Sequence, residues 1–236
     1  GVSPNGVADI ANLAATAVTA DSAQLNGEVL DIGDTAPSII IRWGDEDGGG
    51  NTGAWDHADA LPGTQGVGNF SATTGTTLLP NTTYFFRAFA SNTAGDSEAS
   101  SSLSFTTLPA APTVTNIAAS NLAADSAAVG GTVTDTGGED PTLFIYWGPS
   151  DGGTTAGSWQ NSVLLGAQSG SATTGLTGLN GGTTYFYRAF VTNNGGSAWA
   201  ATSASFSTQT PQPPSVVNDS ANGITGSSAN LRGEIT

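Results

Sequence analysis

The sequence predicts an all-β protein that consists of two consecutive β-sandwiches. Gly, Ala, Ser, Thr and Asn dominate the composition, which favours short strands and many turns over helices. Short apolar runs alternate with period two, the pattern that places successive side chains on opposite faces of a strand. These runs recur at offsets of 100 to 104 residues, for example from Ser71 to Ser171 and from Asp21 to Asp125. A chain of 236 residues has room for two domains of that size.

Taken in order, the first copy contains seven predicted strands at the spacing that is typical of a sandwich. They lie near residues 8–15, 22–30, 38–43, 55–61, 68–76, 82–91 and 99–107.

The third predicted strand indicates which side chains face the core. Ile39, Ile41 and Trp43 share one face of this strand, and Trp147 stands at the matching position of the second copy. Ile40 and Arg42 share the opposite face. We expect a core in the first copy that is formed by Leu25, Val29, Ile39, Ile41, Trp43, Tyr84, Phe86, Leu103 and Phe105.

The repeat boundaries divide the chain into residues 1–108, 109–210 and 211–236. Proline-containing segments at 108–112 and 209–214 separate these units, and proline favours a short, fairly stiff, extended spacer. The third unit repeats only the first two strands of a sandwich. Two strands cannot bury a core, so we do not expect this unit to fold alone.

The segment at 78–90 and its repeat at 179–191 each open with a turn and continue as an alternating aromatic strand. This pattern resembles the start of strand F in fibronectin type III and related immunoglobulin-like domains, Leu-x-Pro-x-Thr-x-Tyr. The resemblance implies tandem seven-stranded immunoglobulin-like (fibronectin type III-like) β-sandwiches. It also implies that Tyr84 and Tyr185 are "tyrosine corner" residues, whose hydroxyls bond back to the preceding connection. The second copy departs from the pattern with Gly181 in place of proline.

Composition excludes several classes of partner. The chain carries 4 Lys+Arg against 19 Asp+Glu, a formal charge of −15, whereas nucleic acids and anionic membranes are bound by clustered Lys and Arg. No apolar run approaches membrane-spanning length, so we expect no membrane insertion. There is no cysteine and hence no disulfide. The chain begins with glycine and contains no methionine, so we expect a processed product or a fragment.

One glycine-rich loop is a candidate calcium site. Asp45, Asp47 and Asn51 alternate with other residues after the third strand, and such oxygen-bearing side chains can coordinate calcium. The distal glutamate of an EF-hand is missing, and the second copy keeps only Asp151 and the glycines. A tight solvated turn explains the retained residues equally well. We expect no other cofactor.

Two tryptophans in long loops are candidate binding residues. Trp55 and Trp159 each follow the strand tryptophan, Trp43 or Trp147, by twelve residues. Exposed rings at these positions would stack on sugars or contact a partner. Alternatively, the loop folds back to cover the outer face of the sheet, a structural role that the repeated spacing favours. Trp199 has no counterpart in the first copy and is the better candidate for a local contact.

A catalytic site would have to use the single histidine, His57, which lies near Asp56 and Asp59. The second copy has Asn161 at the matching position, and the chain contains no Gly-x-Ser-x-Gly elbow. One histidine is also a poor basis for a zinc site. We therefore predict that the protein is not an enzyme and has no catalytic residues.

Sequences of this kind resemble repeats in long extracellular or cell-surface proteins of bacteria. The resemblance implies a non-enzymatic structural module of a surface or filament protein, either a spacer or stalk or a polymerising fibre subunit. Its expected partners are other copies of itself or neighbouring repeats, and residues 213–236 would complete a sandwich in a neighbouring chain.

Two alternatives remain open. One is a carbohydrate-binding or adhesive accessory module, with glycans as partners. The other is adhesion stiffened by calcium at the junctions between units. That hypothesis requires carboxylates to converge near a linker, and the candidates are Asp31, Asp34, Asp135, Glu139 and Asp140.

Overall fold

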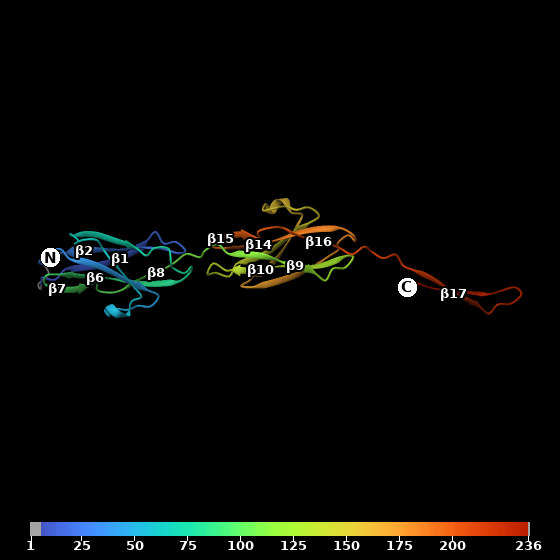
Figure 1. Cartoon of the computed structure of the whole chain (residues 1–236), viewed down its shortest axis with the longest axis horizontal. Helices are drawn as coiled ribbons and strands as arrows, with labels where there is room; N and C mark the ends of the chain where they lie inside the picture. The colour runs from blue at the N-terminus through green and yellow to red at the C-terminus, as the bar shows by residue number, and fades with distance from the viewer. Residues whose placement is uncertain (1–5, 236) are drawn as a thin grey trace.

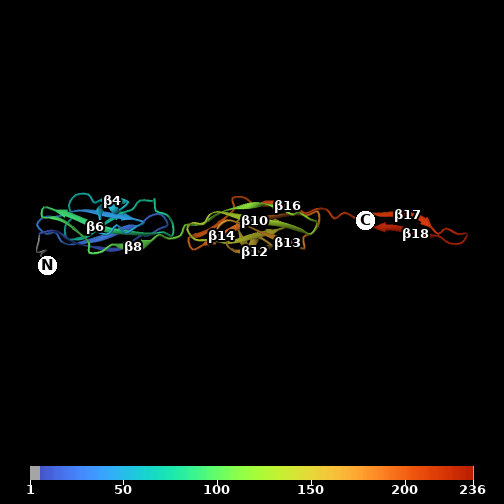
Figure 2. The ribbon, with the colours of Figure 1, turned by 90° about the horizontal axis from the view of Figure 1, so that it is seen from below.

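The computed structural model describes residues 6–235, so residues 1–5 of the first predicted unit and Thr236 of the third lie outside the described part. Two sandwiches and a two-stranded hairpin follow one another along the long axis of the molecule (Figures 1 and 2). The two sandwiches repeat one arrangement of antiparallel sheets. The all-β sandwich fold predicted from the sequence is therefore confirmed.

The first sandwich pairs a three-stranded sheet, in the order β1-β2-β5, with a five-stranded sheet in the order β4-β3-β6-β7. In the second sheet β8 also pairs with β6. The strands are β1 (Asp9–Thr16), β2 (Gln24–Asp31), β3 (Ser38–Gly44), β4 (His57–Ala60), β5 (Gly68–Thr73), β6 (Thr83–Asn92), β7 (Gly95–Glu98) and β8 (Leu103–Thr106), and a short 3-10 turn, η1, spans Thr52–Ala54.

The second sandwich has the same layout, with sheets β9-β10-β13 and β12-β11-β14-β15, the latter joined by β16 on β14. Its 3-10 turn, η2 (Ala156–Ser158), corresponds to η1. Its strands are β9 (Thr113–Ser120), β10 (Ser126–Asp135), β11 (Thr142–Gly148), β12 (Asn161–Ala167), β13 (Ser171–Thr177), β14 (Thr184–Asn193), β15 (Gly196–Trp199) and β16 (Ala204–Ser207).

The strand predicted at 99–107 is wrong in its extent, because only β8 (Leu103–Thr106) forms within that range. A further short strand, β7 (Gly95–Glu98), precedes it. Both β7 and β8 pair with β6, and they are separated by residues 99–102. The side-chain amide of Asn12, on the opposite sheet, donates to the Ser101 carbonyl at 2.7 Å. This hydrogen bond across the sandwich keeps the chain around Ser101 from pairing with β6. The predicted fourth strand also begins later, at His57, because Trp55 ends the 3-10 turn.

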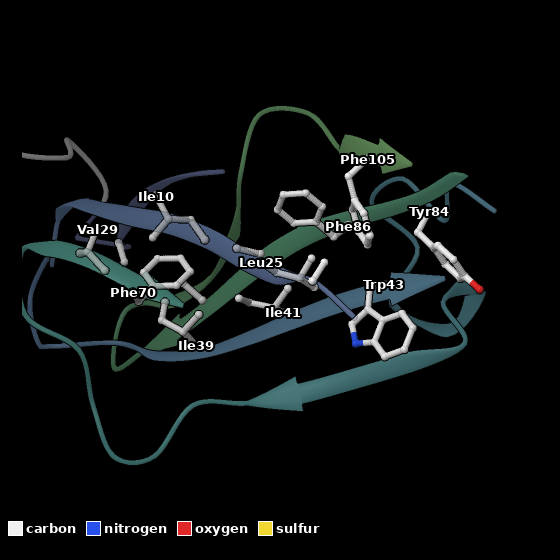
Figure 3. Close-up of a cluster of buried hydrophobic side chains, with 14 of the residues drawn as sticks. Ile10, Leu25, Val29, Ile39, Ile41, Trp43, Phe70, Tyr84, Phe86 and Phe105 are labelled. Carbon is white, nitrogen blue, oxygen red and sulfur yellow. The ribbon is translucent and has the colours of Figure 1, made fainter. Parts of the chain in front are cut away.

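Apolar side chains of the two sheets meet in the core of the first sandwich (Figure 3). All the predicted core residues are buried except Leu103, which is half-buried. Ile10, Phe70 and Leu78 are also buried and were not predicted. A separate buried cluster, from Val114 to Phe206, fills the second sandwich. Each sandwich therefore has a core of its own.

The two predicted corner tyrosines make the same hydrogen bond in both sandwiches. The Tyr84 hydroxyl accepts from the Leu79 N–H at 3.0 Å, and the Tyr185 hydroxyl accepts from the Asn180 N–H at 3.0 Å. Both phenol rings are buried, and the ring of Tyr84 packs beside that of Trp43. The hydroxyls thus fix the connection that leads into β6 and β14, as the resemblance implies.

An asparagine on the first strand of each sandwich links the two sheets. Asn12 Oδ1 accepts from the Ala88 N–H at 2.9 Å, and Asn116 Oδ1 accepts from the Ala189 N–H at 2.8 Å. Each asparagine also donates to a carbonyl, in the second sandwich that of Thr202 at 2.8 Å. Because these bonds join opposite sheets, each asparagine fixes how the sheets lie relative to each other.

The third unit forms an isolated antiparallel hairpin of β17 (Val216–Asn222) and β18 (Asn230–Ile235). Neither strand pairs with any other described strand. Leu231 repeats the position of Leu25, yet its exposed fraction is 87% where that of Leu25 is 0%. The hairpin therefore presents core-type side chains to solvent, as expected for two strands without a second sheet.

Candidate functional site

The glycine-rich loop after β3 is organised as a hydrogen-bonded turn. Asp47 Oδ1 accepts from the Ser102 hydroxyl at 2.6 Å and from the Gly49 N–H at 2.9 Å. Asn51 Oδ1 accepts from the Gly53 N–H at 3.1 Å, as the cap of η1. Within residues 6–235 no group of three acidic or histidine side chains is placed to hold a metal ion. One side-chain oxygen of Asp47 and one of Asn51 thus already accept hydrogen bonds from the protein.

The loop tryptophans Trp55 and Trp159 are buried, so they lack the exposed rings that the carbohydrate-binding alternative requires. Their exposed fractions are 8% and 7%. The indole of Trp55 lies against Gly48, where an added Cβ would come within 2.7 Å of its Nε1. Its Nε1–H donates to the Gly49 carbonyl at 3.3 Å, and the same bond joins Trp159 to Gly153. Each ring therefore closes its own loop, which matches the structural interpretation.

The residues around the single histidine have structural partners. The His57 ring stacks on Trp43, with ring centroids 3.9 Å apart. Asp59 Oδ2 accepts from the Trp43 Nε1–H at 2.7 Å, and Asp56 Oδ2 accepts from the Asp45 N–H at 3.4 Å. In the second sandwich Trp147 Nε1 has no partner, since Val163 stands at the register position of Asp59. The histidine cluster supports the position of Trp43.

The outer face of the second sandwich carries a cluster of aromatic rings. Trp199, which is half-buried, lies with its ring centroid 4.9 Å from that of Tyr146 and 4.7 Å from that of Phe190. Phe144 extends the cluster at 6.3 Å from Tyr146. The planes of Trp199 and its two nearest rings are tilted by 48°. Of the three candidate binding tryptophans, Trp199 is therefore the one on an open sheet face.

The outer face of the first sandwich is more polar. Arg87 pairs with Glu98 at 3.1 Å and donates through Nε to the Ala99 carbonyl at 2.7 Å. The guanidinium that lies over an aromatic ring is that of Arg42, 5.8 Å from the centroid of Phe89.

The junction between the sandwiches is held by hydrogen bonds on both sides. Leu108 N–H donates to the Thr19 carbonyl at 2.9 Å in the first sandwich. Ala110 N–H donates to the Gly137 carbonyl at 2.8 Å, and Asn193 Nδ2 donates to the Ala110 carbonyl at 2.9 Å, both in the second sandwich. Pro109 is the one residue between the bonded residues Leu108 and Ala110. The linker therefore belongs structurally to both sandwiches.

One further bond joins the two sandwiches directly. Asn81 Nδ2, in the turn before β6, donates to the Gly138 carbonyl at 2.8 Å. Gly138 also approaches Pro80 closely, since an added Cβ would lie 2.8 Å from its carbonyl oxygen. The junction was predicted only as a stiff proline spacer, and these contacts were not predicted.

Three of the five carboxylates proposed for calcium at the junctions accept hydrogen bonds from the protein. Glu139 accepts from the backbone N–H and the side-chain amide of Asn194, at 2.9 and 2.6 Å. Asp135 Oδ1 accepts from the Gly137 N–H and Asp31 Oδ1 from the Gly33 N–H, at 2.8 and 3.0 Å. The bonds of Asp135 and Asp31 are local turn contacts. The bonds of Glu139 join two connections of the second sandwich.

Comparisons with known proteins leave the chain without an assigned family. No family model matches the sequence, and no curated protein matches it. Among solved structures, the FN1–FN3 domains of chicken CNTN1 align with 88% of this chain and 68% of that chain, at 15% identity and a TM-score of 0.35. At this TM-score the alignment adds nothing to the fold that the strand order defines. No described helix is long and apolar enough to cross a membrane.

Proposed function

We propose that the chain is a spacer or stalk segment of an extracellular surface protein, with no enzymatic activity. Tandem sandwiches of one kind supply length, and the junction contacts supply stiffness. The observation that carries the proposal is the linker, which is bonded to Thr19 on one side and to Gly137 and Asn193 on the other. A formal charge of −15 keeps such a segment soluble outside the cell.

Light scattering on the purified chain, with and without a calcium chelator, tests this proposal. A spacer predicts a monomer with a mass near 23.3 kDa in both conditions. A mass many times larger in both would contradict a passive spacer and support a fibre. A large mass that collapses on chelation would instead support calcium at the junctions.

A fibre subunit is the second candidate, because the hairpin exposes residues whose counterparts in the two sandwiches face a second sheet. Asn218 pairs with Gly233, as Asn12 pairs with Gly27 and Asn116 with Gly131. It therefore stands at the position from which Asn12 and Asn116 bond to the opposite sheet. Val216, Leu231 and Ile235, at 66%, 87% and 75% exposure, lack the cover that their counterparts have. In this proposal the hairpin of one chain completes a sandwich in another copy.

Substituting the apolar face of the hairpin tests the fibre proposal on the full chain. Leu231→Asp places a charge where a partner sheet would pack, so the fibre proposal predicts that it abolishes self-association. Leu79→Asp is the matched control, since Leu79 is also exposed, at 66%, but lies outside the hairpin. Equal association of both variants and the wild-type chain would contradict docking through the hairpin.

A further inference from the structure

The outer face of the first sandwich contains a hollow with a volume of about 280 Å³, just below the usual range for ligand cavities. Ile40 and Arg42 of β3 and Phe89 of β6 line it. Thr52 of η1 and Asp96 of β7 also line it. Further hydroxyls come from Ser38 and Ser91. The hollow thus combines an apolar surface, a cation, a carboxylate and several hydroxyl groups.

Arg42 brings a guanidinium without a hydrogen-bond partner to this hollow. Among the described residues its Nε is sealed from solvent and unpaired, and its guanidinium lies over the ring of Phe89. In contrast, Arg87 is paired with Glu98, and Arg188 donates to two backbone carbonyls. The terminal nitrogens of the guanidinium are not among the sealed atoms. An acceptor oxygen in the hollow would therefore bond to them.

The second sandwich shows that the fold does not require the hollow. Tyr146 stands at the register position of Arg42, opposite an arginine of the neighbouring strand. Trp199 stands opposite Phe190, where the first sandwich has Glu98 opposite Phe89. The rings of Tyr146, Phe190 and Trp199 pack together over this face. The polar hollow is therefore a feature of the first sandwich alone, not of the repeat.

We propose that the hollow binds a uronic acid, a sugar ring that carries a carboxylate. The carboxylate accepts from Arg42, whose planar guanidinium matches it in shape and charge. Hydroxyls of the ring donate to Asp96 and exchange hydrogen bonds with Thr52. The apolar face of the ring packs on Phe89 and Ile40.

Other simple ligands fit these groups less well. A plain carboxylate such as acetate has no hydroxyl group that could donate to Asp96. A neutral sugar leaves the guanidinium of Arg42 without a charged acceptor. The net negative charge of the chain repels an anionic ligand, but salt screens this repulsion beyond about 8 Å at physiological ionic strength. The proposal is independent of the spacer function, because it concerns one face of one sandwich.

An NMR titration of the full chain with glucuronic acid, read on backbone amides, tests the proposal. We expect saturable shifts at residues 38–42, 89–91 and 96–97. The corresponding residues 142–146 of the second sandwich serve as an internal control and should not shift. Glucose lacks the carboxylate and acetate lacks the sugar ring. Each should bind about tenfold more weakly than glucuronic acid, because a tenfold change corresponds to the loss of about one charged hydrogen bond.

Two variants extend this test. Arg42→Gln should weaken glucuronic acid binding about tenfold. Arg232→Gln removes the same charge from the distant hairpin and should change nothing. If Arg42→Gln does not fold, the three ligands on the wild-type chain still decide the matter.

Four results would overturn the proposal. Two are that acetate or that glucose binds as tightly as glucuronic acid. The third is that the shifts spread equally over both sandwiches. The fourth is that binding does not saturate below about 10 mM of ligand, because such weak affinity would show no specific site.

Discussion

At the residue scale, Asp47 and Asp151 occupy the same turn position in the two sandwiches. The Ser102 hydroxyl and then the Gly49 N–H lower the pKa of Asp47, and the equivalent groups lower the pKa of Asp151. A lowered folded-state pKa means that the carboxylate stabilises the folded form above its ordinary pKa of 3.8. This contribution is lost as the pH falls through the lowered folded-state value.

Asp47→Asn is therefore expected to lower the melting temperature at pH 7 by about 2 °C, the size of one exposed charged contact in a domain of this length. The difference from the wild-type chain should shrink as the pH falls below 3.8 and through the lowered folded-state pKa, because Asp47 then becomes protonated. Thermal unfolding followed by circular dichroism measures it. Glu46→Gln makes the same charge change without a turn bond, and an equal effect of both variants would contradict this account.

Tyr185→Phe removes the hydroxyl that accepts from Asn180 and leaves a partly buried N–H unpaired. We expect a loss of about 1–2 kcal/mol in the free energy of unfolding of the second sandwich. Tyr146→Phe is the matched control, because no hydrogen bond of its hydroxyl is found in the described chain. Denaturant unfolding of both variants checks the difference. Equal stability of the two would mean that the corner hydroxyl contributes nothing.

At the element scale, strand alternation predicted the faces of β3 and β6 because that signal is local to each strand. It could not predict the break between β7 and β8, which depends on Asn12 of a distant strand. The outward position of Arg42 also followed from alternation. Its lack of a partner did not, since the sheet register decides that Glu98 reaches Arg87.

The loop tryptophans show the same limit. Their repeated spacing favoured a structural role, but their burial depends on glycines within the loop. An added Cβ at Gly152 would come within 2.6 Å of the Trp159 ring, whereas one at Gly157 meets nothing within 4 Å. Packing of this kind has no periodic signal in the sequence.

Gly152→Ala should therefore displace the Trp159 ring and open the loop, while Gly157→Ala should leave it in place. The resonance of the Trp159 Nε1–H in a ¹H–¹⁵N spectrum reports the change, since this group donates to Gly153. Limited proteolysis of the loop should accelerate only in Gly152→Ala. An unchanged resonance in that variant would contradict the packing described for the loop.

At the scale of the whole molecule, the repeated sequence predicted separate units with stiff spacers between them. The two linkers differ in a way that their proline content does not show. Ala110 is bonded to the second sandwich, so the first linker is held on both sides. In the second linker Gln209 is bonded to Ala123 and Gly182 of the second sandwich, but the hairpin that follows pairs with no other described strand. We therefore expect the two sandwiches to move as one body and the hairpin to move separately.

Asn193→Ala should loosen the first junction, because it removes the side chain that holds the Ala110 carbonyl. Asn92→Ala is the matched control, since Asn92 makes the equivalent bonds to Gly6 and Ile32 within the first sandwich, away from the junction. Small-angle scattering should show a shorter mean length for Asn193→Ala and an unchanged length for Asn92→Ala. Shortening in both would assign the effect to the sandwiches themselves.

The most direct test of the stiff-spacer account is ¹⁵N relaxation of the wild-type chain in solution. The account predicts that amides of both sandwiches report one anisotropic tumbling of a single elongated body, while the hairpin shows additional motion. Two separate, faster correlation times, each typical of a free domain of about 100 residues, would contradict it.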